Sequence, residues 1–336
     1  MTEQQVLPPV QQRLMEFISE CVTPGRNYVS KLVGDASSRQ YFRLGTEDNK
    51  SFIIAVYPEP FTVKDFSYYQ VYTLLGQVAI SVPEIIEMDE QRGIVMQQDL
   101  GDESLQKRLM SLPAPQWDSL LKQAIDVVVR IQTEAGKRCT PEYQACRLAF
   151  DYEKLSFEFK FFFQHYVSSY RQMNYDDVRR AALFREFDAI AHELASYPRY
   201  LAHRDYHSRN IMMVKDQMFV IDFQDARMGP AAYDLVSILK DSIDLTESQM
   251  HAMVRYFLSF KHLKQEDYLD FWTQFELMSV QRLLKALGTY GYQITVRSNF
   301  IYQQYIPGTL HRAYQSVLKV KRFPQIQALL EQEIFA

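Results

Sequence analysis

The sequence predicts an α+β fold of two lobes, in which a small β-rich lobe precedes a larger helical one. Between Asn27 and Gln97 the chain consists mostly of short runs of β-branched and aromatic residues, and turn-prone segments separate these runs. Beyond Leu100 the apolar residues recur almost throughout at the spacing of a helix. Two such lobes leave a cleft between them, which is where ligands commonly bind.

The first lobe is expected to begin as a β-meander. The turn-prone segments Gly34–Ser38 and Gly45–Asn49 separate its first three strands, and the helix Val63–Leu75 precedes its last two. We divide the chain after residue 96, into lobes 1–96 and 97–336. The expected strands are Tyr28–Val33, Arg39–Leu44, Phe52–Tyr57, Ile85–Met88 and Gly93–Gln97.

The second lobe is expected to be helical except for one stretch. In that stretch the short apolar runs Tyr200–Ala202, Ile211–Val214 and Met218–Ile221 are separated by dense polar residues, which predicts a small hairpin that presents a loop. The expected helices are Ser104–Met110, Gln116–Thr133, Tyr152–Gln172, Asp177–Ser196, Glu247–Lys261 and Glu266–Leu287.

Composition narrows the classes of protein. Among the 336 residues, 22 Phe and 22 Tyr against 11 Gly predict an aromatic-rich core and exclude a disordered chain. The net charge of −4 gives no global field that would recruit nucleic acid or anionic lipid. Three cysteines are an odd number for a disulfide framework and favour a reducing compartment. No targeting segment and no apolar run of membrane-span length is found, so we expect a cytoplasmic protein.

The segments His203–Asn210 and Val220–Phe223 carry the strongest chemical signal. Phosphoryl transfer needs a carboxylate that orients the attacking hydroxyl and oxygen ligands for the Mg²⁺ that bridges the ATP phosphates. Asp205, Asn210 and Asp222 supply these groups, at the spacing that kinases use. Taken singly, each could simply cap a turn or a strand end. Together with the His-Arg-Asp motif they indicate an ATP- and Mg²⁺-dependent kinase of a small hydroxyl-bearing molecule.

These segments resemble the aminoglycoside phosphotransferase superfamily, kinases with a protein-kinase-like two-lobed fold that include choline and homoserine kinases. A more specific resemblance is to the bacterial N-acetylmuramate/N-acetylglucosamine anomeric kinases of cell-wall recycling, and it spans Val33 to Gly288. The segments that carry it are Gly34–Arg43, Asp222–Ala226, Gly229-Pro230, Tyr233-Asp234 and Val280–Lys285. The resemblance implies phosphorylation of the anomeric hydroxyl of an N-acetylated amino sugar.

The resemblance also assigns roles within the site. Asp205 would be the catalytic base, Asn210 and Asp222 the Mg²⁺ ligands, and Asp234 a buried brace between the catalytic loop and the following helix. The loop that would cover the phosphates contains Gly34, Ser37 and Ser38. The adenine would lie against the segment between the lobes, which contains Met96, Gln97 and Asp99.

One pair of residues usual in kinases is missing. The third strand, Phe52–Tyr57, contains no lysine, and the helix Val63–Leu75 contains no glutamate to pair with it. Arg39 follows the phosphate loop and shares a strand face with Arg43, so Arg39 is the first candidate to counter the phosphate charge. Lys64 is a weaker candidate. A solvated strand-face arginine remains the competing interpretation.

Contacts to the acceptor are expected from the residues around Asp222 and from one face of the last long helix. The candidates are Asp225, Arg209, Gln281 and Arg282. Met278 and Lys285 lie on the same helical face, although a solvated surface would explain Gln281 and Lys285 as well. The aromatic-rich stretch 289–307 departs from the pattern of the anomeric kinases and is a further candidate for the pocket wall.

Three other functions compete. A metallohydrolase could gather His203, Asp205, His207 and Asp222 around a transition metal, but Asn210 would then have no role. A nucleotide-binding pseudokinase would explain the missing lysine–glutamate pair, yet it gives no reason for the three chemical groups to persist. Another alcohol, such as choline, homoserine or an aminoglycoside, could replace the sugar as acceptor.

Overall fold

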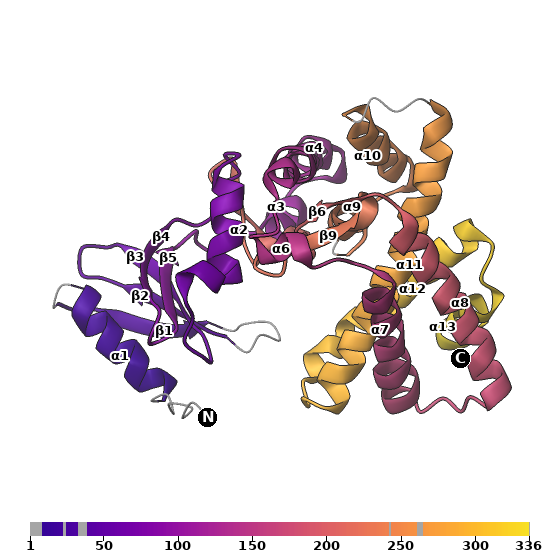
Figure 1. Cartoon of the computed structure of the whole chain (residues 1–336), viewed down its shortest axis with the longest axis horizontal. Coiled ribbons are helices and arrows are strands. Elements are labelled where there is room, and N and C mark those ends of the chain that lie inside the picture. Colours follow the sequence, from indigo (N-terminus) through magenta and orange to yellow (C-terminus); the bar gives the residue numbers. More distant parts are fainter. Residues whose placement is uncertain (1–8, 23–24, 33–38, 242, 261–264, 336) are drawn as a thin grey trace.

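The computed structural model describes residues 9–22, 25–32, 39–241, 243–260 and 265–335. Figure 1 shows a β-sheet lobe near the N-terminus and a larger helical lobe that ends at the C-terminus on the opposite side. The predicted α+β, two-lobed, protein-kinase-like fold is therefore confirmed. No helix among the described residues is long and apolar enough to cross a membrane.

The first lobe contains a five-stranded antiparallel sheet in the order β1-β2-β3-β5-β4. The strands agree with the predicted ones to within one or two residues, because turn-prone segments separate them in the sequence. Their bounds are β1 Tyr28–Leu32, β2 Gln40–Gly45, β3 Ser51–Val56, β4 Ile85–Asp89 and β5 Ile94–Gln98.

Two helices accompany this sheet. Helix α1, Val10–Cys21, was not predicted; its apolar side chains pack on the sheet in a small core with Leu44, Ile54 and Met96. Helix α2 begins at Ser67 and ends at Gly76, later than predicted, because the backbone is extended at Phe66 after a single 3₁₀ turn. Figure 1 shows α2 between the sheet and the helical lobe, and its buried side chains belong to the main core.

The helical lobe surrounds the long helix α11, Gln265–Thr295, which packs against α7, α9 and α12. The other helices are α3 Leu105–Met110, α4 Trp117–Arg130, α5 Gly136–Arg138, α6 Gln144–Arg147, α7 Tyr152–Phe162, α8 Asp177–Ser196, α9 Ala232–Lys240, α10 Glu247–Ser259, α12 Ile306–Val320 and α13 Pro324–Phe335. Of these, α5, α6, α9, α12 and α13 were not among the expected helices.

Helix α11 continues two turns beyond the predicted end at Leu287. Gly288 and Gly291 do not end the helix because they allow close packing against α7 and the π-helical segment that follows it. A Cβ atom at Gly288 would lie 2.7 Å from Cα of Phe162, and one at Gly291 would collide with the backbone of His165. Both glycines therefore serve helix packing.

The predicted hairpin is present, but it is smaller than expected. Strands β7, Ile211–Val214, and β8, Gln217–Val220, form it, while β6, Arg199–Ala202, pairs instead with β9, Arg227–Pro230. Strand β9 was missed because it is short and contains Gly and Pro, which are poor strand signals. The two small sheets hold the polar loops 203–210 and 221–226 next to each other, as the contacts below show.

The cysteine prediction needs a correction. The structure joins Cys139 and Cys146, which flank a short loop between α5 and α6, in a disulfide, whereas the odd number of cysteines had argued against one. Cys21 is exposed and unpaired. An odd total therefore did not exclude a single local disulfide.

Candidate active site

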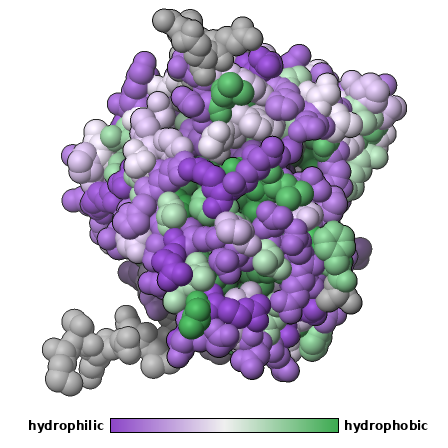
Figure 2. Space-filling model, turned by 90° about the vertical axis from the view of Figure 1, so that its right-hand side faces the viewer, coloured by the Kyte–Doolittle hydropathy of each residue, from purple (hydrophilic) through white to green (hydrophobic). Residues whose placement is uncertain are grey.

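A cavity of about 910 Å³ lies between the two lobes. Side chains from β2 and β3 form one wall, the segment 97–102 forms the back, and the polar loops and α11 form the other wall. Among the predicted residues, Asp205, Asn210 and Asp222 all line it. The outer face of the helical lobe is mostly hydrophilic and carries apolar side chains only in small patches (Figure 2).

The catalytic loop is fixed through its backbone. Asp234, fully buried at the start of α9, accepts hydrogen bonds from the backbone N–H of His203 at 2.6 Å and of Arg204 at 3.0 Å. Burial raises the pKa of Asp234 above its usual value, although both bonds favour the carboxylate. Arg204 has a φ of 85°, a left-handed conformation that its neighbours must hold in place. The brace expected of Asp234 is therefore present.

The loop is also tied to the segment that carries Asp222. Nε2 of His203 lies 3.0 Å from the carbonyl oxygen of Ile221, and the backbone N–H of Ile221 donates to the carbonyl of Asn210 at 3.0 Å. The amide nitrogen of Asn210 donates to the carbonyl of Asp205 at 3.0 Å, which leaves the amide oxygen of Asn210 for another partner. Three separate bonds therefore set the relative position of Asp205, Asn210 and Asp222.

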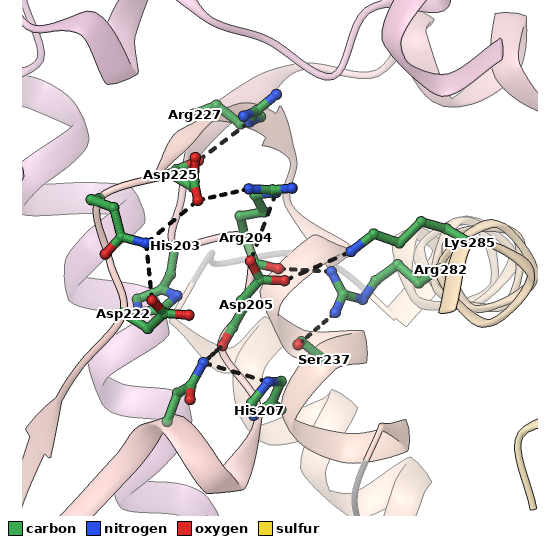
Figure 3. Close-up of polar contacts among 12 residues, drawn as sticks. His203, Arg204, Asp205, His207, Asp222, Asp225, Arg227, Ser237, Arg282 and Lys285 are labelled. Atoms are coloured by element: carbon green, nitrogen blue, oxygen red, sulfur yellow. Dashed lines mark hydrogen bonds and ion pairs between the residues drawn. The ribbon is translucent and has the colours of Figure 1, made fainter. Parts of the chain in front are cut away.

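Asp205 carries two flanking cations. Nε of Arg204 lies 3.7 Å from one carboxylate oxygen and Nζ of Lys285 lies 3.8 Å from the other (Figure 3). Burial by itself would raise the pKa of Asp205, but Lys285, Arg204 and Arg282 hold it well below its usual value. Asp205 is therefore a carboxylate at neutral pH, the form that can accept a hydrogen bond from a hydroxyl.

Asp222 faces the other lobe. Its carboxylate accepts hydrogen bonds from Nη2 of Arg39 at 3.0 Å and from Nε2 of Gln224 at 2.9 Å, and its φ of 62° is left-handed. Arg39 is 13% exposed and lines the cavity with Tyr41, so it is not a solvated strand-face arginine. The predicted strand face is confirmed, and its first arginine reaches the segment that carries the metal-ligand candidate.

The donor set of this site suits Mg²⁺. The oxygens of Asn210 and Asp222 are hard ligands, and Mg²⁺ commonly takes one or two protein ligands and completes its shell with water and phosphate. No group of three or more His, Cys, Asp or Glu that could hold a metal occurs in the part of the chain that the structure describes. The nitrogen Nε2 of His203 is already bonded to the carbonyl oxygen of Ile221. The described residues therefore offer no ligand cluster of the kind that the metallohydrolase alternative needs.

The segment between the lobes is tied to β2. Arg43 contacts Asp99 at 2.7 Å and Asp102 at 2.8 Å, and Ser51 donates to Asp99 at 2.8 Å. Gln97 lines the cavity and accepts a hydrogen bond from Tyr68 at 2.6 Å. The side chain of Met96 points away, since it is 4% exposed and packs in the small core beneath α1. Any contact of Met96 with a nucleotide must therefore use its backbone.

The predicted acceptor contacts divide into two groups. Asp225, held by Nη1 of Arg204 at 3.0 Å, and Arg209 both line the cavity. Arg282 also lines it but is only 4% exposed, because it donates to the carbonyl of Arg204, to Ser237 and to Asp241. It braces the catalytic loop from α11.

Gln281 requires a correction. Its side chain is fully buried, donates to Glu158 at 2.7 Å, and is not part of the cavity wall. Successive residues on a helix point about 100° apart, so Gln281 faces α7 while Arg282 faces the loop. The helical spacing identified the correct helix, but it could not distinguish these two directions.

The aromatic-rich stretch does contribute to the cavity. Thr289, Tyr290 and Tyr302 line it, as do Asp241 and Thr309, which the sequence analysis missed. The predicted phosphate-loop residues Gly34, Ser37 and Ser38 lie outside the described residues, so their position stays a prediction.

Comparison with known proteins gives consistent results. Residues 29–269 match the family described as the phosphotransferase enzyme family. A protein of Neisseria meningitidis named N-acetylmuramate/N-acetylglucosamine kinase is 29% identical over 81% of this chain and 80% of its own length. A protein of Pseudomonas putida with the same name is 30% identical over 76% of this chain and 74% of its own length. The solved ternary complex of streptomycin and ATP with APH(2″)-IIa superposes with a TM-score of 0.61 at 12% identity, covering 89% of this chain and 97% of that one.

Proposed function

Since the chain belongs to the phosphotransferase enzyme family and is a small-molecule kinase, we propose that it transfers the γ-phosphate of ATP, with Mg²⁺, to the anomeric hydroxyl of an N-acetylated amino sugar. The observation that carries the proposal is the placement of Asp205, Asn210 and Asp222 around one cavity. The bonds that fix the loop leave the carboxylate of Asp205 and the amide oxygen of Asn210 available to ligands, whereas the carboxylate of Asp222 accepts from Arg39 and Gln224. A pseudokinase would have no need of this arrangement.

Each group has a task in this reaction. Asp205 accepts a hydrogen bond from the acceptor hydroxyl and takes its proton as the new phosphate bond forms. Asn210 and Asp222 would hold Mg²⁺ through their oxygens, and the ion would supply positive charge to the phosphates. Arg39 is close enough to Asp222 to exchange that carboxylate for phosphate oxygens, a role that the planar guanidinium suits.

The nucleotide would fill the half of the cavity next to the sheet. Gln97, Asp99 and the backbone at Met96 would lie beside the adenine, and the loop with Gly34, Ser37 and Ser38 would cover the phosphates. Nucleotide use is supported by the ATP named in the structure with the TM-score of 0.61. A kinase that draws on ATP is expected to work in the cytoplasm.

The acceptor would fill the half next to α11. Asp225 and Arg209 offer charged and hydrogen-bonding groups on that side, and Tyr290 and Tyr302 add aromatic surface. The names of the two similar bacterial proteins support an N-acetylated amino sugar. An anomeric hydroxyl is more acidic than an ordinary alcohol, so a carboxylate with a depressed pKa is a sufficient base once the groups are aligned.

A coupled assay of ADP release tests the proposal. The purified protein is given ATP, Mg²⁺ and, separately, N-acetylmuramate, N-acetylglucosamine, choline, homoserine and an aminoglycoside. We expect release with the two sugars at least tenfold above the other acceptors, and none when EDTA removes Mg²⁺. If ADP is released with choline, homoserine or the aminoglycoside but with neither sugar, the proposed sugar acceptor is wrong. If none of the five acceptors gives ADP release, the proposed function is wrong.

A further inference from the structure

Lys285 reaches the reacting centre from a different element than the other site residues. It lies on α11, is 21% exposed and lines the cavity, and its ammonium lies 3.8 Å from a carboxylate oxygen of Asp205. Figure 3 shows it extending toward Asp205 from the side of α11, next to Arg282. At 3.8 Å the ammonium attracts the carboxylate without a direct hydrogen bond.

The other cations around Asp205 are already occupied. Arg282 donates to a backbone carbonyl, a serine hydroxyl and the carboxylate of Asp241. Arg204 is paired with Asp225 at 3.0 Å. Among the described residues, by contrast, the ammonium of Lys285 makes one ion pair, with Asp205 at 3.8 Å, and no hydrogen bond, so its three N–H donors can serve a ligand.

We propose that Lys285 is a catalytic residue that contacts the phosphoryl group while this group passes from ATP to the acceptor. The inference rests on the proposed function and extends it. Asp205 must touch the acceptor hydroxyl, and the transferred phosphorus lies next to that oxygen. A cation within 4 Å of Asp205 and open to the cavity therefore lies where the phosphoryl oxygens pass.

The chemistry balances without any further reactant. A bond forms between the acceptor oxygen and the γ-phosphorus, the bond from this phosphorus to the bridging oxygen breaks, and ADP leaves with that electron pair. The acceptor proton moves to Asp205. Lys285 takes no part in the proton transfer; it provides positive charge and hydrogen bonds to the equatorial oxygens. Lys285 would supply, on the acceptor side, part of the positive charge that the missing β3 lysine provides in other kinases. Arg39 would supply positive charge on the nucleotide side.

Lys285→Met keeps most of the side-chain stem and removes the charge, so it separates chemistry from packing. We expect kcat with N-acetylglucosamine to fall about 10²–10³-fold, the usual loss for one group that stabilises developing charge. The KM for ATP should change less than threefold, because the ammonium lies beyond the nucleotide. Lys285→Arg should recover part of kcat. The matched control is Lys122→Met, a half-buried lysine on α4 whose ammonium lies over the Tyr256 ring outside the cavity, and we expect it to behave as wild type.

A binding measurement without turnover provides the second test. Calorimetry compares the affinity for Mg²⁺–ADP with and without aluminium fluoride, which mimics the phosphoryl group in transfer. Fluoride should strengthen binding by at least tenfold in the wild type and the Lys122→Met control, and by less than threefold in Lys285→Met.

Distinct outcomes separate this inference from the proposed function. An equal fluoride gain in Lys285→Met and wild type, or no gain in either, would overturn the role of Lys285. The role would also be overturned if Lys285→Met raised only the KM for ATP or lowered only the unfolding temperature, with kcat unchanged. If the wild type phosphorylates none of the sugars, the proposed acceptor fails, yet the fluoride measurement still decides whether Lys285 contacts the phosphoryl group.

Discussion

The catalytic loop and Arg39, the residue just before β2, face each other across the cavity, but they are held in different ways. The loop is fixed through backbone atoms by α9, by α11 and by the segment that leads to Asp222. Arg39 is joined to the opposite lobe by a side-chain pair with Asp222 at 3.0 Å, between the rings of Tyr41 and Tyr57. A ligand can replace the second kind of contact without disturbing the first.

This difference separates positioning from binding. Because the loop uses the backbone carbonyl of Asp205 and not its carboxylate to hold its shape, changing that side chain should alter the chemistry and leave the fold intact. The pair of Arg39 and Asp222 uses an oxygen that Mg²⁺ would need, so it must rearrange when Mg²⁺–ATP binds. Substitutions on the two sides should therefore affect different kinetic constants.

The largest effect is expected from Asp205→Asn. Turnover should fall about 100- to 10,000-fold, the usual range for a positioned acid–base group, because an amide cannot take the acceptor proton. Calorimetry should find Mg²⁺–ATP affinity within threefold of wild type, and the unfolding temperature should be nearly unchanged. Turnover close to wild type would remove Asp205 from the mechanism.

Asp222→Ala should weaken both binding and chemistry, since a metal ligand serves both. We expect turnover to fall about 100-fold or more and ATP affinity to lose its dependence on Mg²⁺, as seen in titrations with and without the ion. The variant also releases Arg39, so Asp222→Asn, which keeps the shape and one oxygen, is the matched control. If ATP binding in the wild type were independent of Mg²⁺, the metal assignment would be wrong.

Arg39→Ala should act mainly on the nucleotide. Loss of hydrogen bonds to a charged group, about 1.5–3 kcal/mol, corresponds to a roughly 10- to 150-fold fall in kcat/KM for ATP. Arg39→Lys should restore only part of it, because an ammonium does not offer the planar fork. Steady-state kinetics at limiting ATP measure this effect. If Arg39→Ala behaves as wild type there, Lys64 or backbone amides must counter the phosphate charge instead.

The smallest effect is expected from Arg43→Ala. This arginine pairs with Asp99 and the exposed Asp102 at the edge of the segment between the lobes. The pair with Asp102 is largely exposed, and such pairs contribute about 0–1 kcal/mol. The buried Asp99 keeps its bonds from Ser51 and from the N–H of Gly101, so kcat/KM for ATP should fall no more than about fivefold. A larger loss than that of Arg39→Ala in the same assay would exchange the roles of the two arginines.

Local signals made much of the fold predictable from sequence. The strands of the first lobe are bounded by turn residues, and α8 was predicted at its observed bounds, where Asp176 caps the helix by accepting from the N–H of Arg179 at 2.8 Å. The catalytic loop was predictable because its chemistry requires fixed residue types at fixed spacing.

Features that depend on tertiary packing were not predictable. In the sequence, Gly288 and Gly291 look like helix ends, and only the packing of α7 and the segment after it against them explains why the helix continues. Gln281 and its neighbour Arg282 differ in the element that each faces, which the sequence does not reveal. The bond between Arg39 and Asp222 joins residues 183 positions apart in the chain. No local pattern encodes such a contact.

The position of the phosphate on the product tests the central claim most directly. The protein is incubated with ATP, Mg²⁺ and N-acetylglucosamine or N-acetylmuramate, with Asp205→Asn as the control, and the product is examined by phosphorus NMR. We predict the signal of a sugar 1-phosphate with the wild type and its near absence with the variant. Phosphate on another carbon, or a 1-phosphate formed equally well by Asp205→Asn, would contradict the account.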